Sequence, residues 1–224
     1  MVIKGVIFDM DGLLLDTESI YTACFQAIYT SVGKTFPISF KGRLMGRSAT
    51  ETAAMCIREH QLPLTPHEFA ERAAILQMPA FVGCRMMPGA LELVRRLAER
   101  PGLRLAVATG SRKATFLIKT RDHGQLVDKM HAIVTGDDPA VTRAKPAPDI
   151  FLEAARRLEV KPEECIVFED SPNGVRAALA AGMRAIWVPD RQLGHEVEHS
   201  DLFSHPDVCL LPSLHEFHDF HLSA

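Results

Sequence analysis

Short apolar runs separated by amphipathic stretches are the dominant pattern along this chain of 224 residues. Five runs have the length and composition of buried β-strands: Ile3–Phe8, Leu103–Ala108, Ala132–Val134, Cys165–Phe168 and Ala185–Val188. Apolar residues at helical spacing lie between most of them, in Ala90–Arg100, Pro148–Leu158 and Gly174–Ala181. Alternating strands and helices predict βαβ units with right-handed crossovers. We therefore expect an α/β fold, with a Rossmann-like core in which helices flank a parallel sheet.

One long stretch, Asp16–Arg85, breaks this alternation. Helical patterns occupy most of it, around Ser19–Ser31, Thr50–His60 and Pro66–Gln77. We expect residues 16–88 to form a helical cap inserted after the first strand, and residues 1–15 and 89–224 to form the core. Two linker passages, residues 13–16 and 86–89, would then act as the hinge.

Composition and charge narrow the class of protein. The apolar content of 47% fits a globular domain, and a formal charge of −3 without long charged blocks predicts neither nucleic-acid nor membrane binding. Acidic residues interrupt the apolar amino terminus where a signal peptide needs an uncharged core. Five scattered cysteines without a Cys-x-x-Cys pair predict reduced thiols and a cytoplasmic location. No apolar heptad demands a partner chain, so we expect a monomer.

The first apolar run ends in two acidic residues, Asp9 and Asp11. Buried strands do not normally end in acid pairs, but acids at strand carboxyl ends converge on ligands in the crevice of open α/β sheets. An extended backbone would put both side chains on the same side of the chain. Their repulsion then calls for a cation, a shared proton or solvent. The alternative is an ordinary acidic turn.

Three further polar clusters lie along the chain, two of them directly after apolar runs. Thr109-Gly110-Ser111 follows one run, Lys145 is followed by Pro146 and Pro148, and Glu169-Asp170 follows another run. Together with the first acid pair they supply a hydroxyl, a cation and a second acid pair. These groups are what Mg²⁺ binding and phosphoryl transfer require.

In these motifs the chain resembles the phosphatases of the haloacid dehalogenase superfamily over nearly its whole length. Asp9-Met10-Asp11-Gly12, followed by Leu15-Asp16-Thr17-Glu18, matches that family's first motif in the version followed by a helical cap. Within the superfamily the chain is most similar to the eukaryotic pseudouridine-5′-phosphatase group. The segments behind this closer match are Met87-Pro88-Gly89, Gly136-Asp137-Asp138-Pro139, Lys145-Pro146-Ala147-Pro148-Asp149-Ile150-Phe151 and Glu169-Asp170-Ser171-Pro172-Asn173-Gly174.

The resemblance implies a Mg²⁺-dependent phosphomonoester hydrolase acting on a small nucleotide or sugar phosphate, with pseudouridine 5′-phosphate as the favoured substrate. It implies that Asp9 is the nucleophile that forms an aspartyl-phosphate, and that Asp11 is the general acid and then the general base. Thr109 and the Gly110 amide would hold phosphoryl oxygens, and Lys145 would neutralise their charge. The implied metal ligands are Asp9, Asp11 through its backbone carbonyl, Asp170, and Glu169 directly or through water.

Several of these residues have alternative interpretations. Thr109 and Ser111 are also good helix N-caps, although Ser111 is a candidate for substrate binding as well. Lys145 on its own would be a solvated surface lysine. Asn173 belongs either to a turn that starts a helix or to the groups that orient the preceding acid pair.

The candidate cap contributes a second set of residues. Residues 44–48 resemble the family's substrate-specificity loop, from which Arg47 would pair with the substrate phosphate or a ribose-side group. The alternative for Arg47 is a solvated arginine at a helix start. Thr17 and Glu18 would serve the hinge or the cap interface, and Arg112 either faces the pocket mouth or is solvated.

Two histidine patterns near the carboxyl terminus suggest metal binding. His195-Glu196-Val197-Glu198-His199 spells the zincin motif, but it follows the last predicted strand and lacks the extended metzincin pattern. We therefore do not expect a protease, and adventitious zinc binding stays open. His215, His218 and His221 recur every three residues, which favours a polar face around Phe217 and Phe220 over a metal site.

Two other functions compete with hydrolysis. A phosphosugar mutase of β-phosphoglucomutase type shares the fold and the central residues. Mutases of that type have a histidine where this chain has Tyr21, and a cap lysine that is absent between Arg43 and Arg112. Both differences favour hydrolysis. The other competitor is a non-catalytic binding protein on the same scaffold, against which the complete set of candidate catalytic residues argues.

Overall fold

A six-stranded parallel sheet forms the centre of the larger lobe of the computed structural model, which describes residues 2–190, 193, 200–218 and 222. The strand order is β3-β2-β1-β4-β5-β6. The strands are β1 Gly5–Phe8, β2 Arg104–Thr109, β3 Ala132–Thr135, β4 Cys165–Glu169, β5 Arg184–Trp187 and β6 Val208–Leu210. The predicted α/β fold with a parallel sheet is confirmed. The edge strand β6 was not predicted, because three partly exposed residues carry too little apolar pattern.

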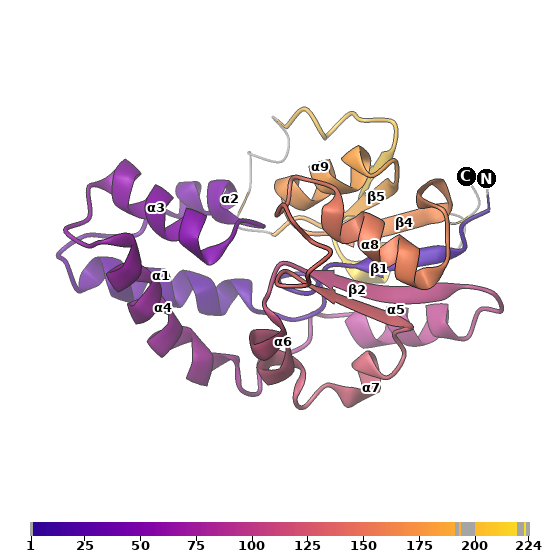
Figure 1. Ribbon diagram of the computed structural model, residues 1–224, viewed down its shortest axis with the longest axis horizontal. Coiled ribbons are helices and arrows are strands. Elements are labelled where there is room, and N and C mark those ends of the chain that lie inside the picture. The colour runs from indigo at the N-terminus through magenta and orange to yellow at the C-terminus, as the bar shows by residue number, and fades with distance from the viewer. Residues whose placement is uncertain (1, 191–192, 194–199, 219–221, 223–224) are drawn as a thin grey trace.

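Helices cover both faces of the sheet (Figure 1). They are α5 Ala90–Ala98, α6 Lys113–Thr120 and α7 Gly124–Val127 on one side, and α8 Asp149–Leu158 and α9 Pro172–Ala180 on the other. Successive side chains of a strand point to opposite faces of the sheet, so each packs against the helices on one face or the other. Val6 and Phe8 of β1 pack in the cluster that holds the α5 side chains, whereas Ile7 packs in the cluster that holds α8 and α9.

Four helices between β1 and α5 form the smaller lobe, seen at the left of Figure 1. They are α1 Glu18–Thr30, α2 Lys41–Leu44, α3 Ala49–His60 and α4 Pro66–Phe81. This lobe has an apolar cluster of its own, in which Tyr29, Phe36 and Phe69 are almost completely buried. The prediction that α4 ends near Gln77 was too short by four residues, and its last residue, Phe81, is buried.

The two chain passages that join the lobes run side by side. Leu15 and Met86 form an antiparallel bridge, and Asp16 N donates to Arg85 O at 2.8 Å. Met87 N donates to Leu14 O at 2.9 Å. The two covalent connections between the lobes therefore lie next to each other.

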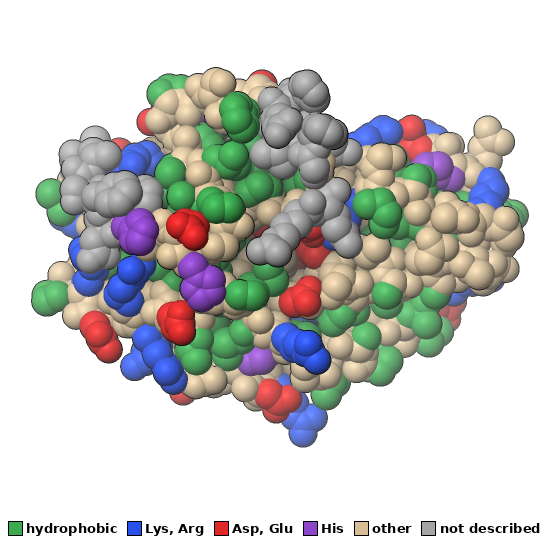
Figure 2. Space-filling view, turned by 180° about the vertical axis from the view of Figure 1, so that it is seen from behind, with side chains coloured by type: hydrophobic (Ala, Val, Ile, Leu, Met, Phe, Trp, Pro, Cys, Tyr) green, Lys and Arg blue, Asp and Glu red, His purple; other side chains and the backbone are tan. Residues whose placement is uncertain are grey.

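The surface carries no large area of one charge on the side shown in Figure 2, where acidic and basic side chains are interspersed. Within the described part of the chain, no helix combines the length and apolar character that crossing a membrane requires.

Candidate active site

A cavity of about 570 Å³ lies between the carboxyl end of the sheet and the smaller lobe. Asp9 follows β1, Thr109 ends β2 and Glu169 ends β4. Because β1 lies between β2 and β4 and all three are parallel, their carboxyl ends meet at one edge of the sheet. The separate polar clusters of the sequence are brought together here.

Lys145 lies between two carboxylates at the floor of this site. Its Nζ is 2.5 Å from Asp9 Oδ1 and 2.6 Å from Glu169 Oε1. The residue is only 6% exposed, so the interpretation as a solvated surface lysine is wrong. Burial on its own would lower the pKa of Lys145, but the charges of Asp9 and Glu169 raise it. Lys145 therefore stays protonated.

Asp9, Glu169 and Asp170 form a buried acid cluster, with one carboxylate oxygen from each lying within 4.8 Å of the others. Glu169 Oε2 accepts hydrogen bonds from the backbone N–H groups of Asp170 and Ser171, each at 3.1 Å, and from Ser171 Oγ at 3.0 Å. Asp170 Oδ2, by contrast, is buried without a hydrogen-bond partner. An orphaned buried carboxylate oxygen beside two further carboxylates fits a divalent cation.

Burial and neighbouring charges raise the pKa of two acids of this cluster, Asp9 and Asp170. Burial raises the pKa of Asp9 to about 8, a rise that Lys145 opposes and Glu169 reinforces. Burial also raises the pKa of Asp170 well above its ordinary value, as do the charges of Glu169 and Glu18.

Two glycines leave the space that the acid cluster occupies. Gly12 has a φ of +81°, and a Cβ there would lie 2.1 Å from Asp170 Oδ2. A Cβ on Gly174 would lie 1.8 Å from Glu169 Oε1. Neither position can take a side chain without moving a carboxylate of the cluster.

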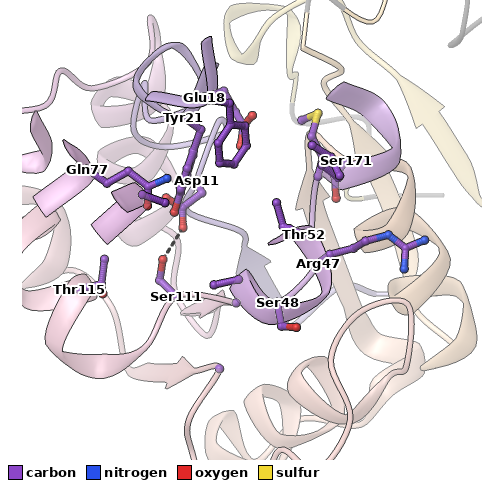
Figure 3. A pocket seen from close by; sticks show the side chains of 18 of the residues that line it. Asp11, Glu18, Tyr21, Arg47, Ser48, Thr52, Gln77, Ser111, Thr115 and Ser171 are labelled. Carbon is purple, nitrogen blue, oxygen red and sulfur yellow. Dashed lines mark hydrogen bonds between the residues drawn. The ribbon is translucent and has the colours of Figure 1, made fainter. Parts of the chain in front are cut away.

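The carboxylate of Asp11 accepts hydrogen bonds from both lobes. Thr109 Oγ1 and Ser111 Oγ donate to its Oδ2 at 3.1 and 2.8 Å, the latter drawn in Figure 3. Thr17 Oγ1 donates to its Oδ1 at 2.8 Å, a contact more specific than the hinge role expected of Thr17. The helix that follows begins at Lys113, after Arg112, so Thr109 and Ser111 are not its N-caps.

Lys119 of α6 also reaches Asp11, and it was not predicted from the sequence. Its Nζ donates to Asp11 Oδ1, and lies 2.9 Å from both Tyr21 Oη and Ser111 Oγ. Burial alone would raise the pKa of Asp11, but Lys119 outweighs it, with help from Thr17 and Ser111, and the net shift is downward. Burial raises the pKa of Tyr21 to about 12.

A second unpredicted lysine, Lys41 of α2, lies on the wall that the smaller lobe contributes. Its Nζ is 2.5 Å from Asp190 Oδ2 and 3.5 Å from Glu18 Oε2. Burial raises the pKa of Glu18 to about 7, although Lys41 lowers it. The sequence holds no lysine from residue 43 to residue 112, yet the helical lobe does present a lysine to the cavity.

Residues 44–48 line the cavity on the side of the smaller lobe and contact the start of α9. Gly46 is close to Ser171, and Asn173 Nδ2 donates to Met45 O at 2.8 Å. Asn173 therefore contacts this loop, while Ser171 contacts Glu169. Arg47 lines the cavity, but its Nε donates to Arg43 O and its guanidinium points away from Asp11 in Figure 3.

The remaining sequence candidates lie at the edge of this site or away from it. Gly110, Ser111 and Arg112 line the cavity. The His195–His199 motif and His221 fall outside the described residues. His215 lies 3.6 Å from Glu92, and it is not part of the acid cluster at the sheet.

Comparison with known proteins agrees with this geometry. The family model described as haloacid dehalogenase-like hydrolase matches residues 3–182. The (DL)-glycerol-3-phosphatase 1, mitochondrial, of Arabidopsis thaliana is 43% identical over 97% of this chain and 76% of its own length. A probable pseudouridine-5′-phosphatase of Drosophila melanogaster is 40% identical over 85% of this chain and 83% of its own length. The crystal structure of CbbY from Rhodobacter sphaeroides in complex with phosphate is 28% identical with a TM-score of 0.76, covering 96% of each chain. The chain belongs to the haloacid dehalogenase-like hydrolase family.

Proposed function

We propose that this phosphatase hydrolyses a small phosphate monoester with Mg²⁺, through an aspartyl-phosphate on Asp9. The observation that carries the proposal is the buried acid cluster, in which Asp170 Oδ2 has no hydrogen-bond partner. Asp9, Asp170 and the backbone carbonyl of Asp11 would hold the ion. Glu169, whose oxygens already accept hydrogen bonds, would act through water. When bound, the ion supplies positive charge that keeps Asp9 ionised and offsets the charge of the phosphate.

The two aspartates of the first motif divide the proton and bond changes between them. Asp9 attacks phosphorus while the ester P–O bond breaks, and Asp11 gives its proton to the departing oxygen. Asp11 then takes a proton from water, whose oxygen attacks the acyl-phosphate. The bond between phosphorus and Asp9 breaks, orthophosphate leaves, and Asp11 is protonated again.

The phosphoryl oxygens would be held by groups at the carboxyl ends of β2 and of the loop before α8. The Gly110 amide, directly after β2, would supply a donor, and the buried Lys145 would supply the positive charge. The hydroxyls of Thr109 and Ser111 already donate to Asp11, so either would bind the substrate only by giving up that bond. Arg47 would reach the substrate only if its side chain turned from the position drawn in Figure 3.

The cavity favours pseudouridine 5′-phosphate as the substrate. Four aromatic side chains of the helical lobe are among the residues that line it: Tyr21 and Phe25, which are partly exposed, and the buried Phe69 and Phe81. A volume of about 570 Å³ is in the range of sites for drug-sized ligands, and aromatic rings are suited to stack on a nucleobase. Glycerol 3-phosphate is the alternative, because a relative at 43% identity is a glycerol-3-phosphatase.

Hydrolysis is the better proposal than phosphosugar mutation. Tyr21 occupies the sequence position at which the mutases of β-phosphoglucomutase type have a histidine. Its hydroxyl contacts Lys119, which in turn contacts Asp11. Lys41 pairs with Asp190 and Glu18, so its charge is already offset. We also propose that residues 16–88 act as a cap that moves on the two paired linkers, and that the enzyme works in the cytoplasm as a monomer.

Phosphate release from a panel of esters tests this function. The panel holds pseudouridine 5′-phosphate, uridine 5′-phosphate, glycerol 3-phosphate and β-glucose 1-phosphate, each with Mg²⁺ and with EDTA. Asp9→Asn should abolish release, and Asp122→Asn, a matched change at an exposed aspartate, should not. A preference for the pseudouridine ester over its uridine isomer supports the named substrate, and an even profile removes it. No Mg²⁺-dependent release from any ester would contradict hydrolysis and favour the mutase or a non-catalytic scaffold.

A further inference from the structure

Lys119 is a buried cation that the phosphatase reaction, as derived above, does not use. It extends from α6 of the larger lobe, and only 1% of the residue is exposed. Its ammonium lies 4.2 Å from the centre of the Phe81 ring and 5.0 Å from that of Tyr21. Burying an ammonium group is expensive unless it is paired and hydrogen-bonded, so a lysine here calls for an explanation.

All three N–H groups of this ammonium have partners. They donate to Asp11 Oδ1, Tyr21 Oη and Ser111 Oγ. Ser111 Oγ in turn donates to Asp11 Oδ2. Lys119 therefore reaches one carboxylate oxygen of Asp11 directly and the other through Ser111.

The position of Lys119 separates it from the substrate. Asp11, Tyr21 and Ser111 line the cavity, whereas Lys119 lies behind them with a side chain that has no exposed area. Lys145 is the cation that contacts Asp9. A direct role for Lys119 in binding the phosphate would require it to leave three hydrogen bonds.

We propose that Lys119 is the positioning residue for the acid–base group, fixing the orientation of the Asp11 carboxylate directly and through Ser111. This inference rests on the proposed function. Thr17 and Thr109 donate to the same two oxygens, one each, but both are neutral. Among the donors to Asp11 only Lys119 carries a charge of its own, so its contact is an ion pair as well as a hydrogen bond. The acid–base group thus stays aligned first with the leaving oxygen and then with the attacking water.

Lys119→Met tests the positioning role, because methionine fills a similar volume and packs well against aromatic rings. With an alkyl phosphate from the panel, kcat should fall about 10- to 100-fold, a large part of what general acid–base catalysis contributes, while KM changes less than about twofold. With p-nitrophenyl phosphate, whose leaving group needs no proton, the burst of nitrophenolate should stay fast and only the later steady rate should fall. Lys113→Met, an exposed change on the same helix, is the control.

The same substitution in an Asp11→Asn background separates this inference from other roles. If Lys119 acts through Asp11, Lys119→Met should change kcat less than about twofold there. An equal loss in both backgrounds, or an unchanged kcat in Lys119→Met alone, would overturn the inference. Should Lys119→Met not fold, Lys119→Gln, which keeps N–H donors but removes the charge, takes its place, and its loss of kcat should likewise disappear in the Asp11→Asn background. If the wild-type protein releases no phosphate with Mg²⁺, the proposed function is wrong. If the wild-type protein is active and the Lys119 variants are equally active, only the positioning role of Lys119 is wrong.

Discussion

Gly12→Ala should disable the metal site while leaving the fold intact. Gly12 lies in the loop after β1 with a φ of +81°, and the nearest atom to an added Cβ is Asp170 Oδ2 at 2.1 Å. That oxygen is the orphaned one of the acid cluster. The backbone carbonyl of Asp170 is held by Trp187 Nε1 at 3.0 Å, so the overlap is relieved mainly by turning the Asp170 carboxylate away.

The substitution has two effects that differ in size and in readout. A left-handed φ costs an alanine about 1–2 kcal/mol, which lowers the free energy of unfolding. The displaced carboxylate adds a loss of metal affinity, which we expect to be about 10- to 100-fold, the range found when groups that orient metal ligands are removed. Activity at low Mg²⁺ should fall by a similar factor and recover in part at high Mg²⁺.

Gly102→Ala is the matched control for the backbone effect. Gly102 has a φ of +77°, but an added Cβ there would meet nothing within 4 Å. Urea unfolding in EDTA should show a similar loss for both variants, whereas Mg²⁺ titration followed by calorimetry should show weaker binding for Gly12→Ala only. Wild-type Mg²⁺ affinity in Gly12→Ala, or an equal loss of affinity in Gly102→Ala, would refute the placement of the ion at Asp170.

Three further predictions follow from the buried charges. Lys145→Met should lower the free energy of unfolding by about 3–5 kcal/mol, because it leaves Asp9 and Glu169 buried without their cation; urea denaturation measures this, and a loss below about 1 kcal/mol would contradict it. Burial raises the pKa of Asp9 from 3.8 to about 8, so between these pH values the folded protein holds a proton that the unfolded chain releases. The free energy of unfolding in EDTA should therefore fall as the pH rises from about 4 to about 8. Protons compete with the ion for the same carboxylate, so the apparent Mg²⁺ affinity should rise over the same window, and a flat profile by calorimetry would argue against Asp9 as a ligand.

Much of the site was predictable from the sequence because a parallel sheet gathers the carboxyl ends of its strands at one edge. Asp9, Thr109 and Glu169 each end or follow a buried run, so the pattern that predicts the strands also predicts that these residues meet. Lys145 lies outside any strand, and the neighbouring prolines together with the resemblance to a known family pointed to it. Its burial between two carboxylates had to come from the structure.

Lys119 and Lys41 show what the sequence does not reveal. Lys119 lies on the buried face of α6 with Phe116 and Thr120, three residues before it and one after it. In the sequence, a lysine at such a position reads as a solvent-exposed residue that breaks the apolar pattern of the helix. Its partner Asp11 is 108 residues away, and Asp190 is 149 residues from Lys41. A buried lysine can be recognised only when its partner is known, and local periodicity gives no information on contacts at this separation.

The balance of buried charge supports the proposal that this site binds a cation. Four carboxylates, those of Asp9, Asp11, Glu169 and Asp170, are within the site, and the two buried lysines that contact them offset only half of their charge. Lys119 serves Asp11, and Lys145 is shared by Asp9 and Glu169. The uncompensated charge falls on Asp9 and Asp170, the two of these four carboxylates whose pKa is raised, and a single divalent ion would offset it. Binding of one Mg²⁺ per chain should therefore release protons near neutral pH, which titration in a weakly buffered solution would detect, and binding without proton release would show that these carboxylates are already ionised.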